Sequence, residues 1–420
     1  MKTLFKNARI LKMTGEEIFF GNLVVEGNRI SYIGDIIPQD KYDQTIECDG
    51  NVLMPGFKDC HTHSAMVFLR GYADDYSLQE WLFDKVIPCE EKLIKEDVYE
   101  LTKLACLEYF SSGITTVMEM YYFPDMLRLA FLDMNMRAIV QLQATSYLND
   151  GMMEEYYEEF NKEGSLVSAR LGLHAEYTSS PEDFALIERL VQKYKAPFYI
   201  HLSETKTEEE NCLKNRGMSA TKFLDKEGLF NYGGGGYHCV HLNDEDMEIF
   251  RKHNLSAILN TGSNTKLASG IPNVKKLLEH DINIALGTDG AASNNCLNMF
   301  KEMALVSSLS KVTTGDASFL KAEEILKMAT VNGAHAVGLM DCDILEVGKL
   351  ADIIMIDLKK PSMQPINNIV KNIVYAGSKD IVKMTMVNGK IVYMDGKFFV
   401  GEPIEEMYQK CQQITDRIIK

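Results

Sequence analysis

The sequence has little of what marks a secreted or membrane-bound chain. Its nine cysteines among 420 residues are odd in number and irregularly spaced, and no CxxC motif occurs. This pattern argues against a disulfide framework and against a cysteine-rich zinc site, and free thiols fit the cytoplasm. No run of 18 apolar residues exists, and the N-terminus lacks the apolar centre of a signal peptide, so we expect no membrane segment.

Positive charge is also scarce. The chain has 44 Lys and Arg residues against 60 Asp and Glu residues, which gives a net charge of −16. This balance argues against nucleic acid and anionic membranes as main partners, and leaves a small molecule as the expected ligand. The hydrophobic fraction of 46% and the charged fraction of 25% are ordinary for a globular protein.

Both ends of the chain are rich in β-forming residues separated by turns. At the C-terminal end, Asn388–Gly389 and Asp395–Gly396 are hairpin signals. The segments expected to be strands are 7–11, 18–25, 29–33, 352–356, 370–375, 381–387 and 390–393. We therefore predict one small β-sandwich domain assembled from residues 1–54 and 344–400, followed by an amphipathic helix over 401–420.

The middle of the chain alternates between short apolar runs and helical patterns. The apolar runs lie near 52–60, 114–120, 137–143, 169–175, 197–203, 237–242, 256–261 and 282–288. Helical patterns between them include 97–111, 181–194, 244–253 and 273–281. Eight strand–helix repeats predict an α/β fold with a (β/α)8 TIM-like barrel over residues 55–343. The glycine run 233–236 before the sixth strand is expected to be a flexible loop.

Six of the nine histidines follow the ends of the predicted barrel strands, where this fold builds its chemistry. They are His61, His63, His174, His201, His238 and His241. His61 and His63 stand two residues apart in a strand, so both side chains point to the same face. They are either metal ligands or a costly pair of buried polar groups.

Two carboxylates accompany these histidines. Glu204 comes three residues after His201 and is either a general acid/base or a solvated residue at a helix start. Asp289 ends the eighth strand and is either a helix N-cap or a functional carboxylate. Together, the histidines of strands one, five and six and Asp289 converge on one barrel mouth. Such ligands suit Zn²⁺ or Fe²⁺, which would lower the pKa of a bound water.

Six motifs carry a resemblance that covers nearly the whole chain. They are MPGFKDCHTHSAMVFLRGYADD (54–75), EWLFDKVIPCEEKL (80–93), HLSET (201–205), HCVHL (238–242), SNTKLASG (263–270) and LGTDGAASNN (286–295). The sequence resembles the amidohydrolase superfamily, in its branch of aromatic-amine deaminases and chlorohydrolases. Within that branch it is most similar to the group of 5′-methylthioadenosine/S-adenosylhomocysteine deaminases.

The resemblance implies one divalent metal ion, with Zn²⁺ expected ahead of Fe²⁺. The ligands that it implies are His61, His63, His201 and Asp289. Relatives with two metals carry a carboxylated lysine at the end of strand four, and ARLGLHAEYTSS has no lysine there. In HCVHL, His238 matches the functional imidazole better than His241, which is then structural.

The resemblance also implies the residues that bind a nucleoside. Glu90 matches a carboxylate that accepts the ribose hydroxyls, and this interpretation is favoured over a glutamate on a helix surface. His174 matches a histidine that contacts the ligand. Related enzymes that act on S-adenosylhomocysteine offer arginines for its carboxylate, whereas residues 138–169 contain none and the matching position is Leu142. An uncharged 5′-substituent is therefore expected.

These expectations describe a cytoplasmic, metal-dependent aminohydrolase that converts an adenine nucleoside to the inosine-type product and ammonia. The favoured substrates are 5′-methylthioadenosine, 5′-deoxyadenosine and adenosine, ahead of S-adenosylhomocysteine. Asp289 would take a proton from water, Glu204 would protonate the ring and contact the substrate, and His238 would steady the attacking hydroxide. The resemblance makes a homo-oligomer plausible.

Three alternatives are weighed against this function. A deaminase or chlorohydrolase could act on another ring, such as guanine, a pterin or a triazine. A catalytically silent metal-binding barrel would have no need of Glu204 as a proton shuttle. A cytidine-type deaminase would require a P-C-x-x-C motif, but Pro88–Cys89 is followed by two glutamates.

Overall fold

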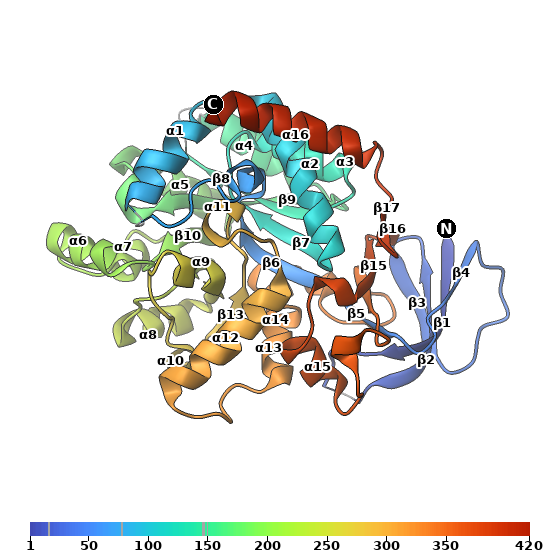
Figure 1. Ribbon diagram of the computed structural model, residues 1–420. Helices are drawn as coiled ribbons and strands as arrows, with labels where there is room; N and C mark the ends of the chain where they lie inside the picture. The colour runs from blue at the N-terminus through green and yellow to red at the C-terminus, as the bar shows by residue number, and fades with distance from the viewer. Residues whose placement is uncertain (16, 77–78, 145–147, 149) are drawn as a thin grey trace.

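The computed structural model describes residues 1–15, 17–76, 79–144, 148 and 150–420. Its central sheet has eight parallel strands, and each strand pairs with the next one along the chain. The strands are β6 (Phe57–Thr62), β7 (Ile114–Glu119), β8 (Arg137–Gln143), β9 (Val167–Ala175), β10 (Phe198–Leu202), β11 (Gly234–His238), β12 (Ser256–Leu259) and β13 (Asn283–Leu286). Figure 1 shows them at the centre of the larger body.

The last strand returns to the first, which closes the barrel. The backbone N–H of Asp289, just after β13, donates to the carbonyl oxygen of His61 in β6 at 2.9 Å. The backbone N–H of Thr288 donates to the buried carboxylate of Asp59 at 2.8 Å. These bonds join the ends of strands one and eight, which carry the predicted site residues His61, His63 and Asp289.

Helices surround the barrel on its outside (Figure 1). They are α1 (Ile87–Glu90), α2 (Lys95–Ser111), α3 (Pro124–Asp133), α4 (Asp150–Phe160), α5 (Pro181–Tyr194), α6 (Lys206–Arg216), α7 (Ala220–Lys226), α8 (Asp244–His253), α9 (Thr261–Lys266), α10 (Val274–Glu279), α11 (Ala291–Asn294), α12 (Met299–Thr314), α13 (Ala322–Met328) and α14 (Val331–Ala336). The 3₁₀ segments are η1 (Ser64–Leu69), η3 (Glu176–Thr178), η4 (Met340–Cys342), η5 (Pro361–Met363) and η6 (Lys379–Ile381), and η2 (Glu80–Val86) is a π-helix.

Capping residues set the limits of several helices. Ser180 accepts a hydrogen bond from the backbone N–H of Asp183 at 3.2 Å and starts α5, with Pro181 at the first helical position. Asn243 caps α8 in the same way, and left-handed Asn254 ends that helix. Among the described residues, none of the helices is both long and apolar enough to cross a membrane.

A second, nine-stranded sheet draws its strands from both ends of the chain. Its strands are β1 (Lys2–Ile10), β2 (Phe19–Glu26), β3 (Arg29–Gly34), β4 (Gln44–Glu47), β5 (Val52–Pro55), β14 (Ile353–Ile356), β15 (Val382–Val387), β16 (Lys390–Met394) and β17 (Lys397–Phe398). The antiparallel pairing of β5 with β14 joins the two ends. The predicted fold class, a barrel with a small β-domain from both termini, is therefore confirmed.

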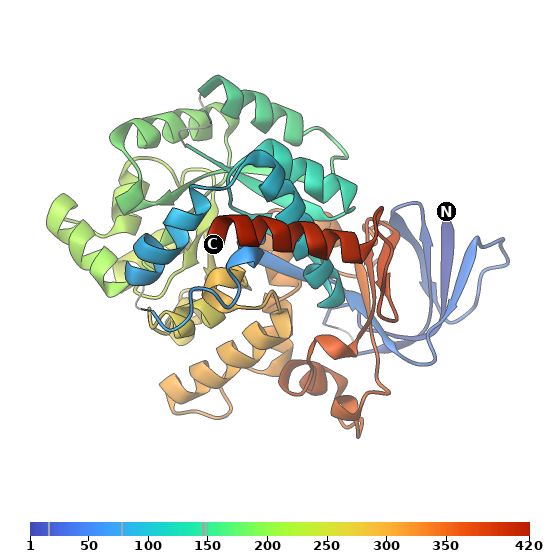
Figure 2. The same ribbon diagram turned by 45° about the horizontal axis from the view of Figure 1, so that its top comes forward.

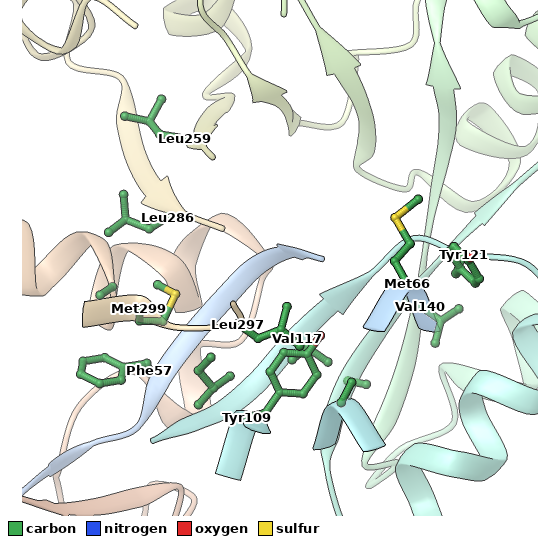
Figure 3. Packing of buried hydrophobic residues seen from close by; sticks show 14 of the residues in the cluster. Phe57, Met66, Tyr109, Val117, Tyr121, Val140, Leu259, Leu286, Leu297 and Met299 are labelled. Atoms are coloured by element: carbon green, nitrogen blue, oxygen red, sulfur yellow. The ribbon is translucent and has the colours of Figure 1, made fainter. Parts of the chain in front are cut away.

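A layer of buried apolar side chains lies between the barrel strands and the helices (Figure 3). Val117 of β7 and Val140 of β8 point into this layer, and Tyr109 of α2 packs there without exposure to solvent. Each fully buried aliphatic or aromatic side chain contributes roughly 1.5–3 kcal/mol to folding. This packing holds the strand ends, and so the site, on a rigid frame.

A buried ion pair connects the barrel to the small β-domain. Arg137, at the start of β8, donates to both carboxylate oxygens of Asp352 at 2.5 and 3.1 Å. The backbone N–H of Asn388 donates to the same carboxylate at 2.7 Å. Burial alone would raise the pKa of Asp352, but the charge and hydrogen bonds of Arg137 outweigh it and hold that pKa below its ordinary value.

The C-terminal helix α16 (Ile404–Ile419) packs on α2 and η1, as both views show for α2 (Figures 1 and 2). Met407, Cys411 and Ile418 are the buried residues of this helix. Arg417 donates to the carbonyl oxygen of Lys92 at 3.3 Å. The end of the chain therefore lies against the segment that follows α1.

Two sequence predictions about local structure are wrong. The glycine run was expected to be a flexible loop, but residues 234–236 belong to β11 and pair with β10. A Cβ at Gly234 would collide with the carbonyl oxygen of Phe198, so glycine is needed for this close approach. Residues 370–375 were expected to form a strand, but they lie in helix α15 (Ile369–Tyr375), which Asn368 caps.

Candidate active site

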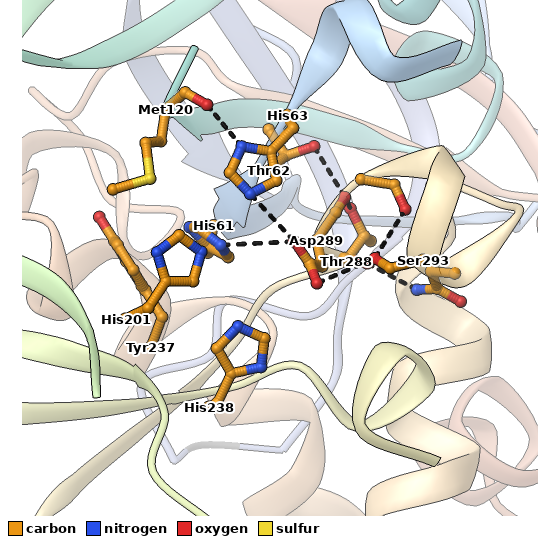
Figure 4. A network of polar contacts seen from close by, with 12 residues as sticks. His61, Thr62, His63, Met120, His201, Tyr237, His238, Thr288, Asp289 and Ser293 are labelled. Carbon is orange, nitrogen blue, oxygen red and sulfur yellow. Dashed lines mark hydrogen bonds and ion pairs between the residues drawn. The ribbon is translucent and has the colours of Figure 1, made fainter. Parts of the chain in front are cut away.

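Four predicted site residues bring their ligand atoms together at the barrel mouth. His61 of β6, His201 of β10, His238 of β11 and Asp289 after β13 each offer one atom, and these atoms lie within 4.8 Å of one another. All four residues are buried. Figure 4 shows the three imidazoles and the carboxylate facing a common centre.

A divalent metal ion fits this group of residues. Within the part of the chain that the structure describes, both ring nitrogens of His61 are buried without a hydrogen-bond partner, and its Nε2 lies 3.5 Å from Oδ1 of Asp289. A buried imidazole nitrogen without a partner costs free energy unless another group satisfies it. Three imidazoles and one carboxylate are a ligand set that suits Zn²⁺ or Fe²⁺.

His63, the other predicted ligand, lies beside this group. Its Nε2 is 3.1 Å from Oδ1 of Asp289, and its Nδ1 donates to the carbonyl oxygen of Met120 at 2.5 Å. His201 is held in the same way, because its Nδ1 donates to the carbonyl oxygen of His174 at 2.7 Å. Such bonds to backbone carbonyls are typical of metal-binding histidines and turn each Nε2 toward the centre.

The charges of this group follow from burial and from Asp289. Burial lowers the pKa of His61 to about 3, although Asp289 opposes this shift. Burial would also lower the pKa of His63, but the hydrogen bond and charge of Asp289 raise it to about 9. His61 is therefore neutral at pH 7, which is the state that binds a metal.

The backbone is strained where the strands end at the site. Ser203, His238 and Asp289 have φ angles of 52°, 68° and 58°, in the left-handed region that side chains other than glycine rarely adopt. Each costs on the order of 1–3 kcal/mol and persists because its surroundings impose it. At these three positions the barrel strands deliver side chains to the site.

Glu204 lies next to the imidazole of His238. Its Oε2 is 3.8 Å from Nε2 of His238, and its Oε1 accepts a hydrogen bond from the hydroxyl of Ser269 at 3.4 Å. Glu208 of α6 holds the backbone of this turn, since its Oε2 accepts from the N–H of Glu204 at 2.9 Å. Burial raises the pKa of Glu204, and this favours a carboxyl group that can carry a proton.

Glu90 faces the cavity instead of solvent. It lies at the end of α1, is 9% exposed, and accepts a hydrogen bond from the hydroxyl of Tyr121 at 2.6 Å. Burial raises the pKa of Glu90 to about 7. The alternative of an exposed helix surface is therefore wrong for this residue. His174 also lines the cavity, and its Nδ1 lies 3.0 Å from the hydroxyl oxygen of Thr178.

One cavity of about 270 Å³ connects these groups. Trp81 of η2 and Tyr121 and Tyr122 after β7 are among its walls. The same walls include Glu204 and, from the metal-ligand group of His61, His201, His238 and Asp289, the last three. The indole N–H of Trp81 donates to the carbonyl oxygen of Ala292 at 3.3 Å, which ties the π-helix to helix α11 after strand eight. None of the described residues that line this cavity is a lysine or an arginine.

Leu142 and His241, which the sequence singled out, lie elsewhere, and so does Glu176 of η3. Leu142 is buried in the core, whereas its neighbour Gln143 lines the cavity. Glu176 is bound by Arg216, which also packs over the ring of Phe223 at 3.8 Å. The Nε2 of His241 lies 2.9 Å from the carbonyl oxygen of Ser269, away from the metal-ligand group.

The sequence reasoning did not single out Asn264, Tyr121 and Gln143. Asn264 accepts a hydrogen bond from His238, and Tyr121 donates one to Glu90. Tyr121 and Gln143 could have been identified by their positions, because they stand at the ends of the second and third barrel strands. Asn264 lies in the SNTKLASG motif, but its contact with His238 spans 26 residues and is not visible in the sequence.

Comparison with known proteins gives consistent results. The profile described as "Amidohydrolase family" matches residues 52–392. A 5-methylthioadenosine/S-adenosylhomocysteine deaminase from Thermoanaerobacter pseudethanolicus is 38% identical over 440 residues, covering 100% of both chains. A 5′-deoxyadenosine deaminase from Methanosarcina mazei is 36% identical and covers 99% of both. The crystal structure of an adenosine deaminase from Xanthomonas campestris with bound zinc superposes with a TM-score of 0.92 at 27% identity, covering 99% of this chain and 98% of that one.

Proposed function

The chain belongs to the amidohydrolase family, and we propose that it hydrolyses the C6 amino group of an adenine nucleoside to give the inosine-type product and ammonia. The observation that carries this proposal is the position of Glu204 beside a metal-ligand group, in a cavity that also contains the carboxylate of Glu90. The residues around Glu204 at one end of that cavity can activate water, and Glu90 at the other end can bind the hydroxyls of a sugar.

We propose Zn²⁺ as the metal, held by His61, His63, His201 and Asp289. His238 lies close enough to join or to flank this set. The zinc in the Xanthomonas campestris adenosine deaminase structure supports this choice. When bound, such an ion lowers the pKa of water toward neutrality and so supplies a nucleophile at physiological pH.

The protein's own groups then move the protons. A carboxylate oxygen of Asp289 accepts the proton that the attacking water loses. Glu204, whose pKa burial raises, delivers a proton to the ring nitrogen next to C6, which makes that carbon accept the attack. The imidazole of His238 orients the attacking water through its Nε2. Asp289 then passes its proton to the amino group, which leaves as ammonia, and Glu204 recovers a proton from the hydroxyl that becomes the 6-oxo group.

The other end of the cavity selects the sugar and its substituent. We propose that Glu90 accepts the ribose hydroxyls and that His174 contacts the bound nucleoside. The wall offers no lysine or arginine among its described residues, and the seven residues outside the described ranges include neither type. A carboxylate on the 5′-substituent would find no cation there, so methylthioadenosine, deoxyadenosine and adenosine are favoured over S-adenosylhomocysteine.

This proposal is tested by ammonia release from zinc-loaded protein. The panel contains 5′-methylthioadenosine, 5′-deoxyadenosine, adenosine, S-adenosylhomocysteine, adenine and guanine. We expect turnover of the uncharged nucleosides, loss of activity after dialysis against a chelator, and recovery when Zn²⁺ is restored. Turnover of guanine alone would instead favour the alternative of another aromatic ring, and silence on every compound would exclude the proposed activity.

A further inference from the structure

A second cavity of about 130 Å³ adjoins the first. The two cavities share three wall residues, Tyr121, Tyr122 and Gln143. The remaining walls of the second cavity come from α2, the start of α3 and the α4 region, namely Lys95, Phe123, Pro124, Asp125, Leu148, Met152 and Tyr156. The activity proposed above does not yet use this space.

Gln143 stands at the junction with an unsatisfied polar atom. It ends β8 and is 9% exposed, and its carboxamide oxygen is buried with no hydrogen-bond partner among the described residues. The preceding inward-facing residue, Gln141, is by contrast bonded to the hydroxyl of Tyr237 at 2.6 Å. A buried acceptor of this kind is costly unless a ligand supplies a donor, so Gln143 marks a place where a bound molecule donates a hydrogen bond.

The walls of the second cavity are mostly apolar and aromatic. The one cation among its described wall residues, Lys95, is paired with Asp125 at 3.3 Å, so the two charges balance each other at the rim. An anionic or zwitterionic substituent would lose water here without finding an unpaired partner. An apolar chain, in contrast, would bury its surface against Met152 and Tyr156.

We propose that Gln143 accepts a ribose hydroxyl and that the second cavity receives an apolar 5′-substituent longer than methylthio. This inference rests on the nucleoside deaminase function proposed above. Glu90 is bonded to Tyr121, and Tyr121 and Gln143 both belong to the shared wall, so a sugar held between Glu90 and Gln143 would lie beside the second cavity. The substrate class is therefore adenosines with 5′-alkylthio or 5′-arylthio groups.

The size of the cavity sets how long the chain can be. A water-sized group needs on the order of 15 Å³ of such space, so 130 Å³ has room for several methylene groups. Burying one methylene group improves binding by about fourfold. The specificity constant should therefore rise from methylthio through ethylthio and propylthio to butylthio adenosine.

The test measures kcat/KM for this series on the zinc-loaded enzyme. We expect an increase of about fourfold per added methylene group over at least two steps. In Met152→Glu the increase should disappear while 5′-deoxyadenosine is still deaminated, because the substitution places a charge in the second cavity only. Met340→Glu, at an exposed position in η4, is the matched control and should keep the full increase.

Three results separate the two proposals. Falling kcat/KM with chain length, with 5′-methylthioadenosine turned over, would overturn the second-cavity proposal and leave the deaminase function standing. An equal increase in Met152→Glu would also overturn it, because the chain would then lie elsewhere. Failure to deaminate any nucleoside would overturn both.

Gln143 has its own test, which separates binding from structure. Gln143→Leu should raise KM for 5′-methylthioadenosine by about tenfold while kcat stays within about twofold. The KM for the 2′,3′-dideoxy analogue of 5′-methylthioadenosine should be the same in Gln143→Leu and in the unaltered protein, since that analogue has no ribose hydroxyl to donate. An unchanged KM, or an equal rise for the dideoxy analogue, would contradict the assignment.

Discussion

The Nδ1 atom of His238 lies 2.7 Å from Oδ1 of Asn264. An amide oxygen only accepts, so Nδ1 carries the proton, and in the neutral ring Nε2 presents a lone pair toward Oε2 of Glu204 at 3.8 Å. Asn264 is itself held in α9, where its backbone N–H donates to the carbonyl oxygen of Asn260 at 2.9 Å. One buried amide therefore fixes the orientation and the tautomer of His238, the histidine that we propose orients the reacting water.

Asn264→Leu should lower kcat by about 10- to 100-fold, because the imidazole of His238 loses the bond that sets its tautomer. Asn264→Asp keeps an acceptor oxygen and should retain much more activity. Steady-state kinetics and metal analysis of both variants check this. Full activity in Asn264→Leu, with unchanged metal content, would show that His238 needs no such support.

Glu204→Gln should reduce kcat by about 10²- to 10⁴-fold, since the amide cannot deliver a proton to the ring. The zinc content should stay near that of the unaltered protein, because Glu204 is not among the proposed ligands. Metal analysis and ammonia release on the same preparation give both values. If turnover stayed intact, Glu204 would not be the acid.

Glu90→Ala should raise KM for nucleosides by about 10- to 100-fold, the range expected for losing hydrogen bonds to a charged group. Any turnover of free adenine should change little, because adenine has no ribose. The comparison therefore isolates the sugar. A specificity constant for 5′-methylthioadenosine that barely moves would show that ribose is not bound at Glu90.

Asp352→Asn should lower the free energy of unfolding at pH 7 by about 3 kcal/mol, because it leaves Arg137 as an unpaired buried charge. The folded-state pKa of Asp352 lies below its ordinary value, so the pair stabilises the fold above about pH 4 and loses this effect as the pH falls further. Denaturant unfolding of the unaltered protein and of Asp352→Asn should be measured from pH 7 to pH 3. The difference between their free energies of unfolding should narrow below pH 4.

The exposed pair of Lys222 and Glu245 supplies the control for that experiment. Glu245→Gln should change the free energy of unfolding by less than about 1 kcal/mol, since solvent screens the charges. The stabilising role of the buried pair would be contradicted if Asp352→Asn changed the free energy of unfolding as little as Glu245→Gln does. A change that grows as the pH falls would contradict it too.

The barrel strands were predictable because each is a short apolar run. The residues at their ends were predictable because they directly follow such a run. His61, His201, His238 and Asp289 all come directly from such strand ends, and the structure brings them together. Helices with clear capping residues were also predictable, as the agreement over 181–194 and 244–253 shows.

The remaining features depend on contacts that the sequence does not display. Whether 370–375 is a helix or a strand cannot be read from a short apolar run, because periodicity does not separate the two. A shift of one residue in β8 decides that Gln143 and not Leu142 faces the cavity. The partners Asn264 and Tyr121 become visible only when loops from different strands meet.

The reaction itself is tested by incubating the zinc-loaded protein with 5′-methylthioadenosine in ¹⁸O-labelled water and identifying the products by mass spectrometry. Hydrolysis at C6 predicts free ammonia and an intact 6-oxo nucleoside that carries the label on its base. Release of free adenine, a product without label, or no ammonia at all would contradict hydrolytic deamination by this site.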